Sequence, residues 1–299
     1  MIWPRFASVM RAVADPAWLA IALGLFSALT LAFANMAVKM GGDILAGRAI
    51  LSSSAALIVA PFALVVPLPD TATIEALAWA IPAHFAYQLC LVRAFERGDL
   101  SLVFPVMRGL APLFTAIGGV WLLGESLHPW GWAGLLLATG AVILFALPAG
   151  RAPWREHPDG RALGWALATS VGIALYNIAD ANGVRVAPQP WTYIVWLFLV
   201  DWVCITFTAL ALRRRVLIGT VRAGWRLGVS AGALSVLSFG GALYAFSLIE
   251  AAKVAALRET SVVWAALFGA RFLGEGAGRR RVIAAVVLVS GLVLLQVAG

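Results

Sequence analysis

The chain has 299 residues, of which 62% are hydrophobic and 12% charged, with a formal net charge of +8. A soluble domain has on average about 25% charged residues, so this chain has too few ionised side chains to coat a soluble globule of its length. Several apolar runs reach the roughly 20 residues that a helix needs to cross a bilayer. The composition therefore excludes an ordinary soluble domain and predicts an all-α, polytopic membrane protein.

Charge clusters and Pro/Gly-rich joints divide the chain into ten expected transmembrane helices. They lie near residues 17–38, 46–67, 72–93, 100–122, 130–148, 162–183, 190–212, 226–249, 252–272 and 280–298. The joints between them are too short to hold a soluble domain, so we expect the function to lie within the membrane. Cys90 and Cys204 fall inside apolar runs far apart and predict no metal site, and we expect no cofactor.

The two halves of the sequence resemble each other. Met107–Ser126 aligns with Leu257–Gly276 at a shift of 150, which places Arg108 on Arg258. The pattern predicts two five-helix repeats, residues 1–150 and 151–299, in one integral membrane unit. Because five is odd, the second repeat enters the membrane inverted, as in many secondary transporters that bind substrate near the midplane.

Basic residues predict the orientation of the chain. The joints after odd-numbered spans carry most of the Lys and Arg, from Lys39 and Arg48 to the run Arg213–Arg215. Basic joints face the cytoplasm, so both termini are expected outside it. We interpret the positive net charge as this topology signal and expect no nucleic-acid partner.

The third span carries a polar cluster, His84, Tyr87 and Gln88, on one helix face, and Pro82 comes just before it in the sequence. Polar groups at membrane depth are expensive and are expected to be paired or to face a water-filled cavity. We interpret the cluster as a substrate-binding cavity wall, with a satisfied interhelical hydrogen-bond cluster as the alternative. His84 also has the intrinsic pKa of a proton-coupling group, although a lone histidine is more often a packing residue.

The fourth span holds Pro105, Arg108, Gly109 and Pro112 close together, which predicts a broken or kinked helix. Broken helices point free backbone groups at ligands. Arg258 and Glu259 stand at the matching place in the ninth span. Either arginine can hold a substrate carboxylate through paired N–H donors. The alternative is an internal gating pair between Arg108 or Arg258 and Glu259 or Glu96.

Spans one and six contribute Asn35, Tyr176, Asn177 and Asp180. The last three share a helix face, where the Asp180 carboxylate would meet a substrate ammonium group. Alternatively, Asp180 lies at a solvated helix end with no role.

Two aromatic residues of the second half, Tyr244 and Trp264, are expected to add cavity walls. Glu125 and Glu275 are expected to be structural, ending one helix and bonding the end of a neighbouring one. Gly228–Gly232 matches a G-x-S-x-G nucleophile pattern, but no histidine follows it. It is better interpreted as a small-residue packing face, and no enzyme activity is predicted.

Ten short spans in two halves, with Leu123-Gly124-Glu125 and Leu273-Gly274-Glu275 after spans four and nine, resemble the EamA type of the drug/metabolite transporter superfamily. The stretches Leu91–Ser101 and Leu243–Lys253 also fit that family. Within it, the cluster in span three and the aromatic-rich composition are most similar to the YddG-type amino-acid exporters. That resemblance implies export of aromatic or other neutral amino acids.

These observations predict a secondary transporter, possessing no ATP-binding motif, that exports amino acids across the inner (plasma) membrane by alternating access. The central cavity is expected between spans 1, 3, 4, 6, 8 and 9 of a monomer in the lipid bilayer. A multidrug exporter of cations with the same fold is the first alternative, and a membrane scaffold without a cavity is the second. The sequence leaves open whether a proton or the substrate gradient drives transport.

Overall fold

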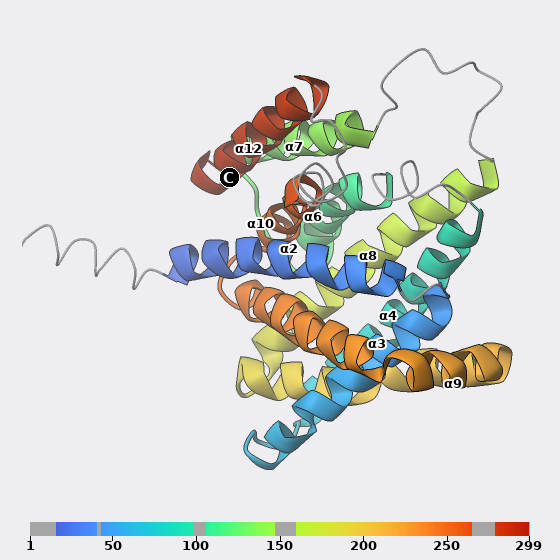
Figure 1. Ribbon diagram of the computed structural model, residues 1–299. Helices are drawn as coiled ribbons and strands as arrows, with labels where there is room; N and C mark the ends of the chain where they lie inside the picture. The colour runs from blue at the N-terminus through green and yellow to red at the C-terminus, as the bar shows by residue number, and fades with distance from the viewer. Residues whose placement is uncertain (1–15, 41–42, 98–105, 147–159, 265–278, 299) are drawn as a thin grey trace, which may run out of the picture.

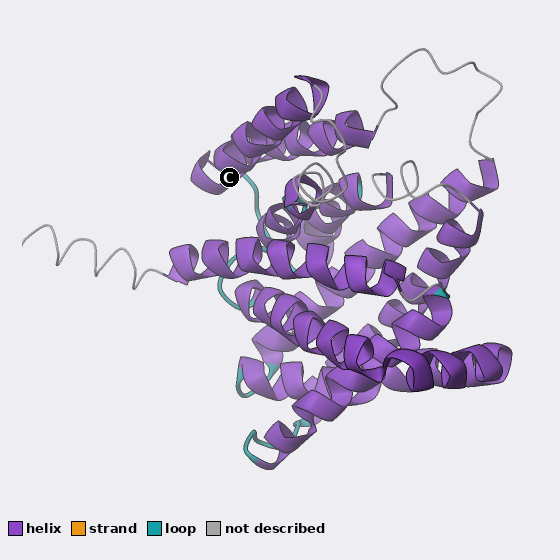
Figure 2. Cartoon of the chain, viewed as in Figure 1, coloured by secondary structure: helices purple, strands orange, loops and turns teal. Residues whose placement is uncertain are grey.

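The fold is that of a computed structural model, which describes residues 16–40, 43–97, 106–146, 160–264 and 279–298. Within these ranges every regular element is a helix (Figures 1 and 2), so the all-α prediction is confirmed there. The elements are α2 (Pro16–Met40), α3 (Ile44–Val59), η1 (Ala60–Leu64), α4 (Thr71–Arg97), α6 (Ala111–Leu122), α7 (Pro129–Ala146), α8 (Gly160–Val186), α9 (Pro190–Phe246), α10 (Ala251–Arg258) and α12 (Arg279–Ala298).

Four of the described helices are long and apolar enough to cross a membrane, and four more are apolar but shorter. The long ones are Ile44–Leu64, Gly160–Val186, Pro190–Arg222 and Gly224–Phe246. The shorter ones are Pro16–Leu31, Val106–Leu122, Pro129–Leu144 and Val282–Ala298. These eight coincide with eight of the ten expected spans, and the third expected span corresponds to α4. The ninth lies partly outside the described residues, so the count of ten stays a prediction.

Expected spans seven and eight form one run, α9, which bends at two places. Arg213 (φ −136°, ψ 31°) and Gly224 (φ −149°, ψ 35°) leave helical geometry. Between them the chain projects beyond the other helices (Figure 1). The bends fall where the apolar run gives way to consecutive arginines and at a glycine, which has little preference for helical dihedral angles. They separate a first part of α9, Pro190 to Leu212, from a second part, Trp225 to Phe246.

The helices of expected spans four and nine are both interrupted just after an arginine. Residues 106–109 form one helical turn that is broken at Leu110 before α6, and α10 ends at Arg258 before a turn at Glu259 and Thr260. Pro112 contributes to the first break because it has no N–H to bond the Arg108 carbonyl. The prediction of a broken fourth span is therefore confirmed, and the shift of 150 that relates Arg108 to Arg258 also relates the two breaks.

The helices associate through small residues. A Cβ atom added at Gly232 of α9 would come within 2.6 Å of Ser54 Cβ in α3, and one at Gly228 would overlap Ile50. The prediction that Gly228–Gly232 is a packing face is confirmed, since only small residues allow such an approach. The α7 and α12 helices likewise pack together, with Gly134 against the Gly291 carbonyl; Figure 1 shows this pair at one side of the bundle.

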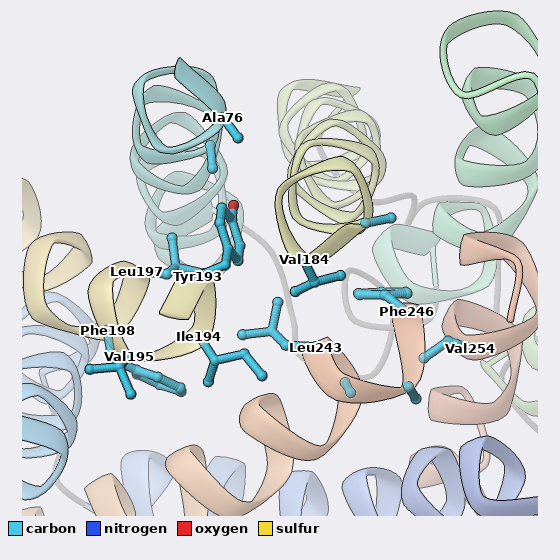
Figure 3. Packing of buried hydrophobic residues seen from close by; sticks show 14 of the residues in the cluster. Ala76, Val184, Tyr193, Ile194, Val195, Leu197, Phe198, Leu243, Phe246 and Val254 are labelled. Carbon is cyan, nitrogen blue, oxygen red and sulfur yellow. The ribbon is translucent and has the colours of Figure 1, made fainter. Parts of the chain in front are cut away.

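The largest apolar cluster fills the space between α4, α8 and both parts of α9 (Figure 3). Its fully buried members include Tyr193, Leu243 and Phe246. Tyr193 reaches from α9 toward α4 (Figure 3), and its ring occupies the place that a side chain at Gly183 of α8 would need. This packing fixes the helices that carry the polar groups described next.

Candidate functional site

A cavity of about 90 Å³ lies where eight segments of the bundle meet. Its lining residues are Leu31, Arg48, Leu51, Ser52, Ala55, His84, Tyr87, Gln88, Arg108, Tyr176, Leu197, Phe198, Asp201, Ser235, Ser238, Phe239 and Arg258. They come from α2, α3, α4, residues 106–109, α8, both parts of α9, and α10. The expected set of spans is therefore extended by α3 and the first part of α9. One water needs about 10–15 Å³ of such space, so the cavity has room for several.

Aromatic rings form one wall of the cavity. The His84 and Tyr176 rings stack with their centroids 4.5 Å apart. Tyr87 lies 5.0 Å from Tyr176, and the Phe239 edge meets His84 at 5.4 Å. Ring pairs at such distances attract each other beyond simple burial. The wall therefore joins α4, α8 and the second part of α9 through contacts between aromatic rings.

Behind this wall Asp180 is completely buried and is bonded by two neighbouring helices. Its carboxylate accepts the Tyr193 hydroxyl at 2.8 Å and lies 3.0 Å from His84 Nε2. The interpretation of Asp180 as a solvated helix end is therefore wrong, because His84 on α4 and Tyr193 on α9 enclose it. Asp180 is not a cavity-lining residue, so a direct meeting with a substrate ammonium group finds no support here.

The breaks of the two interrupted helices bring Arg108, Arg258 and Glu259 together. The Arg108 guanidinium lies 3.3 Å from a Glu259 carboxylate oxygen and donates to the Arg258 carbonyl at 3.4 Å. The Arg258 guanidinium lies over the Phe239 ring at 5.4 Å from its centroid. All three charged side chains are more than 90% buried. The structure contains the internal ion pair of the second interpretation, between Arg108 and Glu259. Both arginines also line the cavity, as the first interpretation requires.

Glu96 does not take part in that pair. It lies at the end of α4 and binds Arg213 at 3.2 Å, with Arg93 3.4 Å away. Arg213 also binds Asp43 at 2.7 Å. The expected pairing of Glu96 with Arg108 or Arg258 is wrong, because Glu96 lies at the partly exposed end of α4, where Arg213 of α9 and arginines of α4 itself are its partners.

Two charged cavity residues, Arg48 and Asp201, were missed by the sequence interpretation. Arg48 counts there as a joint residue, yet it lies inside α3, lines the cavity, and has its guanidinium carbon 5.7 Å from the Tyr87 ring centroid. Asp201, on the first part of α9, lies 3.4 Å from Gln88 Nε2 and 3.9 Å from His84 Nδ1. Its signal is an acidic residue inside an apolar run, which is a candidate functional residue by default.

Six expected site residues line the cavity: His84, Tyr87, Gln88, Arg108, Tyr176 and Arg258. Three others are placed elsewhere. Asn177 donates to Thr115 Oγ1 at 3.2 Å and so links α8 to α6. Tyr244 stacks on Trp191 at 4.9 Å, and Trp264 is 36% exposed. Asn35 lies in α2, and its side chain is outside the described part of the structure.

The first Leu-Gly-Glu motif ends α6 and bonds the start of α10. Gly124 has φ +66°, a left-handed conformation that suits glycine at a helix end. Glu125 accepts the Ala251 N–H at 2.9 Å and binds Arg185 at 2.7 Å. The structural role expected for Glu125 is confirmed, whereas Glu275 falls outside the described residues.

Comparisons with known proteins agree with this architecture. The model of the EamA-like transporter family matches residues 16–147. A solved structure, named only "Crystal structure of protein", superposes with a TM-score of 0.74 at 18% identity, covering 92% of this chain and 96% of its own. Such a likeness shows the fold over nearly the whole chain. No curated relative matches the sequence.

Residues 16–147 are therefore similar to the EamA-like transporter family, and together with the apolar helices this match supports a multi-pass membrane protein. The matching family consists of small-molecule transporters and not of enzymes, so the prediction of a non-enzyme is confirmed by the family match.

Proposed function

We propose that the protein is a secondary transporter that exports amino acids, aromatic or other neutral ones, by alternating access through the central cavity. It would resemble the YddG-type exporters in this. The observation that carries the proposal is the cavity lining: two arginines, Arg108 and Arg258, lie beside an aromatic wall that includes Tyr176. A guanidinium group suits an α-carboxylate, and aromatic rings suit an apolar substrate side chain.

The pairing of the helices supports two inverted five-helix repeats, residues 1–150 and 151–299. Exchange of the two halves relates α2 to α8 and α4 to the second part of α9. The contact of α2 with α9, where Ser238 donates to the Ser27 carbonyl at 2.8 Å, then corresponds to the contact of α4 with α8. In the same scheme α7 corresponds to α12, and these two helices pack on each other.

The breaks after Arg108 and Arg258 bring the two repeats into contact beside the cavity, where the Arg108 guanidinium donates to the Arg258 carbonyl at 3.4 Å. Interrupted helices that meet near a substrate site are a feature of inverted-repeat transporters. In this proposal, the cavity-lining helices of one repeat move against those of the other, while α7 and α12 stay paired. This movement separates Arg108 from Glu259 and opens the cavity to alternate sides. Both termini are proposed to lie outside the cytoplasm of an inner (plasma) membrane, with the arginines of α9 on the cytoplasmic side.

Purified protein in liposomes tests the proposal. Protein-containing vesicles loaded with a panel of radiolabelled amino acids should release the neutral and aromatic ones faster than loaded vesicles without protein. Vesicles with an Arg258→Gln variant should release them more slowly than those with the unmodified protein. A comparison with and without a pH gradient shows whether a proton is coupled. Movement of lipophilic cations without movement of any amino acid would instead establish the multidrug exporter. Fusion of a reporter to the C-terminus tests the orientation independently.

A further inference from the structure

We infer that Asp201 binds the ammonium group of the substrate while Arg258 binds its carboxylate, so that the protein selects molecules carrying both charges. The inference rests on the proposed function and adds a specificity rule to it. It requires a free α-amino group and a free α-carboxylate, and it excludes simple amines, simple carboxylic acids and derivatives with either group blocked.

Asp201 has the accessibility and the free acceptor capacity that an ammonium site needs. Its side chain is 20% exposed and lines the cavity, whereas Asp180 is completely buried and already accepts the Tyr193 hydroxyl. The contacts of Asp201 with Gln88 are long, at 3.4 and 3.5 Å. An ionised carboxylate has about four acceptor positions, so Asp201 can accept N–H donors from a ligand.

Arg258 has the complementary need for an anion. Its side chain is 96% buried, since only 4% of the residue is exposed, and its Nε atom has no hydrogen-bond partner. Among the described residues no ion pair includes Arg258, because the neighbouring Glu259 is paired with Arg108. A buried charge without a counter-charge is costly. A substrate carboxylate, bound through two parallel N–H donors, would remove that cost.

Two rings of the aromatic wall connect the surroundings of these two charged groups. Phe239 contacts both the Arg258 guanidinium and the His84 ring, at 5.4 Å in each case. His84 Nδ1 in turn is 3.9 Å from Asp201. The ammonium and carboxylate groups of an α-amino acid are bonded to one carbon atom. A substrate bound by both Asp201 and Arg258 would therefore place that carbon beside Phe239 and His84, with its apolar side chain against the aromatic rings.

The other charges around the cavity agree with this assignment. Asp201 is the one acidic residue among the described residues that line it, and three arginines line it as well. The Arg48 guanidinium lies near the Tyr87 ring. It forms no ion pair with Asp201, whose nearest basic group is the His84 ring. Asp201 is thus the available anion for a positively charged group of the substrate, and an excess of positive charge remains for a carboxylate.

Transport in liposomes tests the inference with matched ligands. The probes are L-phenylalanine, its amide, its N-acetyl derivative, phenethylamine and 3-phenylpropionate, with the best-transported neutral amino acid and its two blocked derivatives as a second set. The unmodified protein should transport the zwitterions, and the blocked or singly charged analogues should inhibit that transport only at much higher concentrations. Asp201→Asn should raise the KM for the zwitterion roughly 10- to 100-fold, the loss expected for one charge-assisted hydrogen bond, with little change in kcat.

The variants separate binding from structure. In Asp201→Asn, inhibition by 3-phenylpropionate should be unchanged, whereas Arg258→Gln should abolish it and spare inhibition by phenethylamine. Asp201→Glu should keep the preference for zwitterions, and Glu75→Gln on the exposed face of α4 should behave as the unmodified protein. Equal transport of phenylalanine, its amide and its N-acetyl derivative would overturn the inference but leave amino-acid transport intact. Failure of the unmodified protein to move any amino acid would overturn both.

Discussion

The carboxylate of Glu125 accepts the backbone N–H of Ala251 through both of its oxygens, at 2.9 and 3.1 Å. Ala251 is the first residue of α10, where backbone N–H groups have no partner within the helix. The residue just before the helix, Glu250, makes no such bond with its side chain. A glutamate 126 positions earlier in the chain therefore caps this helix, and the negative charge also suits the positive end of its dipole.

We expect Glu125→Ala to reduce the free energy of unfolding by about 1–2 kcal/mol, the usual loss for a helix cap. The same substitution also leaves Arg185 without its 2.7 Å carboxylate partner. Thermal unfolding of the detergent-solubilised protein measures the change. Glu250→Ala is the matched control, and a loss from it as large as that from Glu125→Ala would contradict the capping role.

Gly232→Ala is expected to destabilise the protein by about 1–3 kcal/mol, the range for added atoms in a tightly packed core. The new Cβ would lie 2.6 Å from Ser54 Cβ and 2.9 Å from the Ala55 backbone nitrogen, and a backbone atom cannot rotate away. Gly240→Ala in the same helix is the control, because its Cβ would meet nothing closer than 3.9 Å. Equal unfolding temperatures for the two variants would show that α3 and α9 are not packed this closely.

The buried pair of Arg108 and Glu259 allows a double-mutant cycle. Arg108→Gln or Glu259→Gln alone should cost about 3–5 kcal/mol, because each leaves an uncompensated buried charge. The double variant should lose much less than the sum of the two. Arg213→Gln, which removes a 43% exposed side chain from its pairs with Asp43 and Glu96, should cost only about 0–1 kcal/mol. Strict additivity at Arg108 and Glu259 would mean that they do not interact.

Asp70 makes the start of α4 sensitive to acid. Hydrogen bonds from the Thr73 hydroxyl and the Thr73 N–H, at 2.6 and 2.9 Å, lower the pKa of Asp70 below its ordinary value of 3.8. A carboxylate with a lowered pKa in the folded state stabilises that state above pH 3.8, and the contribution disappears as the pH falls through the lowered pKa.

Hydrogen exchange at the Thr73 amide measures this effect. Protection, corrected for intrinsic exchange, should decrease when the pH is brought from 5 to below 3.8 in the unmodified protein. Asp70→Asn keeps a capping oxygen but cannot titrate, so its protection should be the same at both pH values. A pH-dependent loss in Asp70→Asn would assign the effect to another group.

The sequence predicts the helices and the interruption of span four because apolar runs, prolines and glycines act locally. It also predicts the polar face of α4, since His84, Tyr87 and Gln88 follow helical spacing within one segment. Partners are harder to predict, because they depend on how helices distant in sequence meet. Asp180 is an example: its surroundings are determined by Tyr193 on the next helix and by His84, 96 positions away.

Charge alone also misleads when a residue's depth is unknown. Arg48 has the composition signal of a joint, but α3 begins at Ile44 and therefore carries Arg48 one turn into the bundle. Asn177 has the signal of a ligand-binding amide, yet α6 lies close enough for Thr115 to accept its N–H. For Arg48 the start of the helix, and for Asn177 the nearness of a neighbouring helix, decides whether the side chain lines the cavity or bonds another helix.

The contact between α7 and α12 has a practical consequence for measuring motion. At Gly134 and Gly291 the two backbones touch without intervening side chains, and none of the described residues of either helix lines the cavity. We therefore expect the distance between α7 and α12 to stay constant while the cavity-lining helices move. Spectroscopic labels on the exposed Leu136 and Val289 give the baseline distance distribution, against which rearrangement of the other helices can be calibrated.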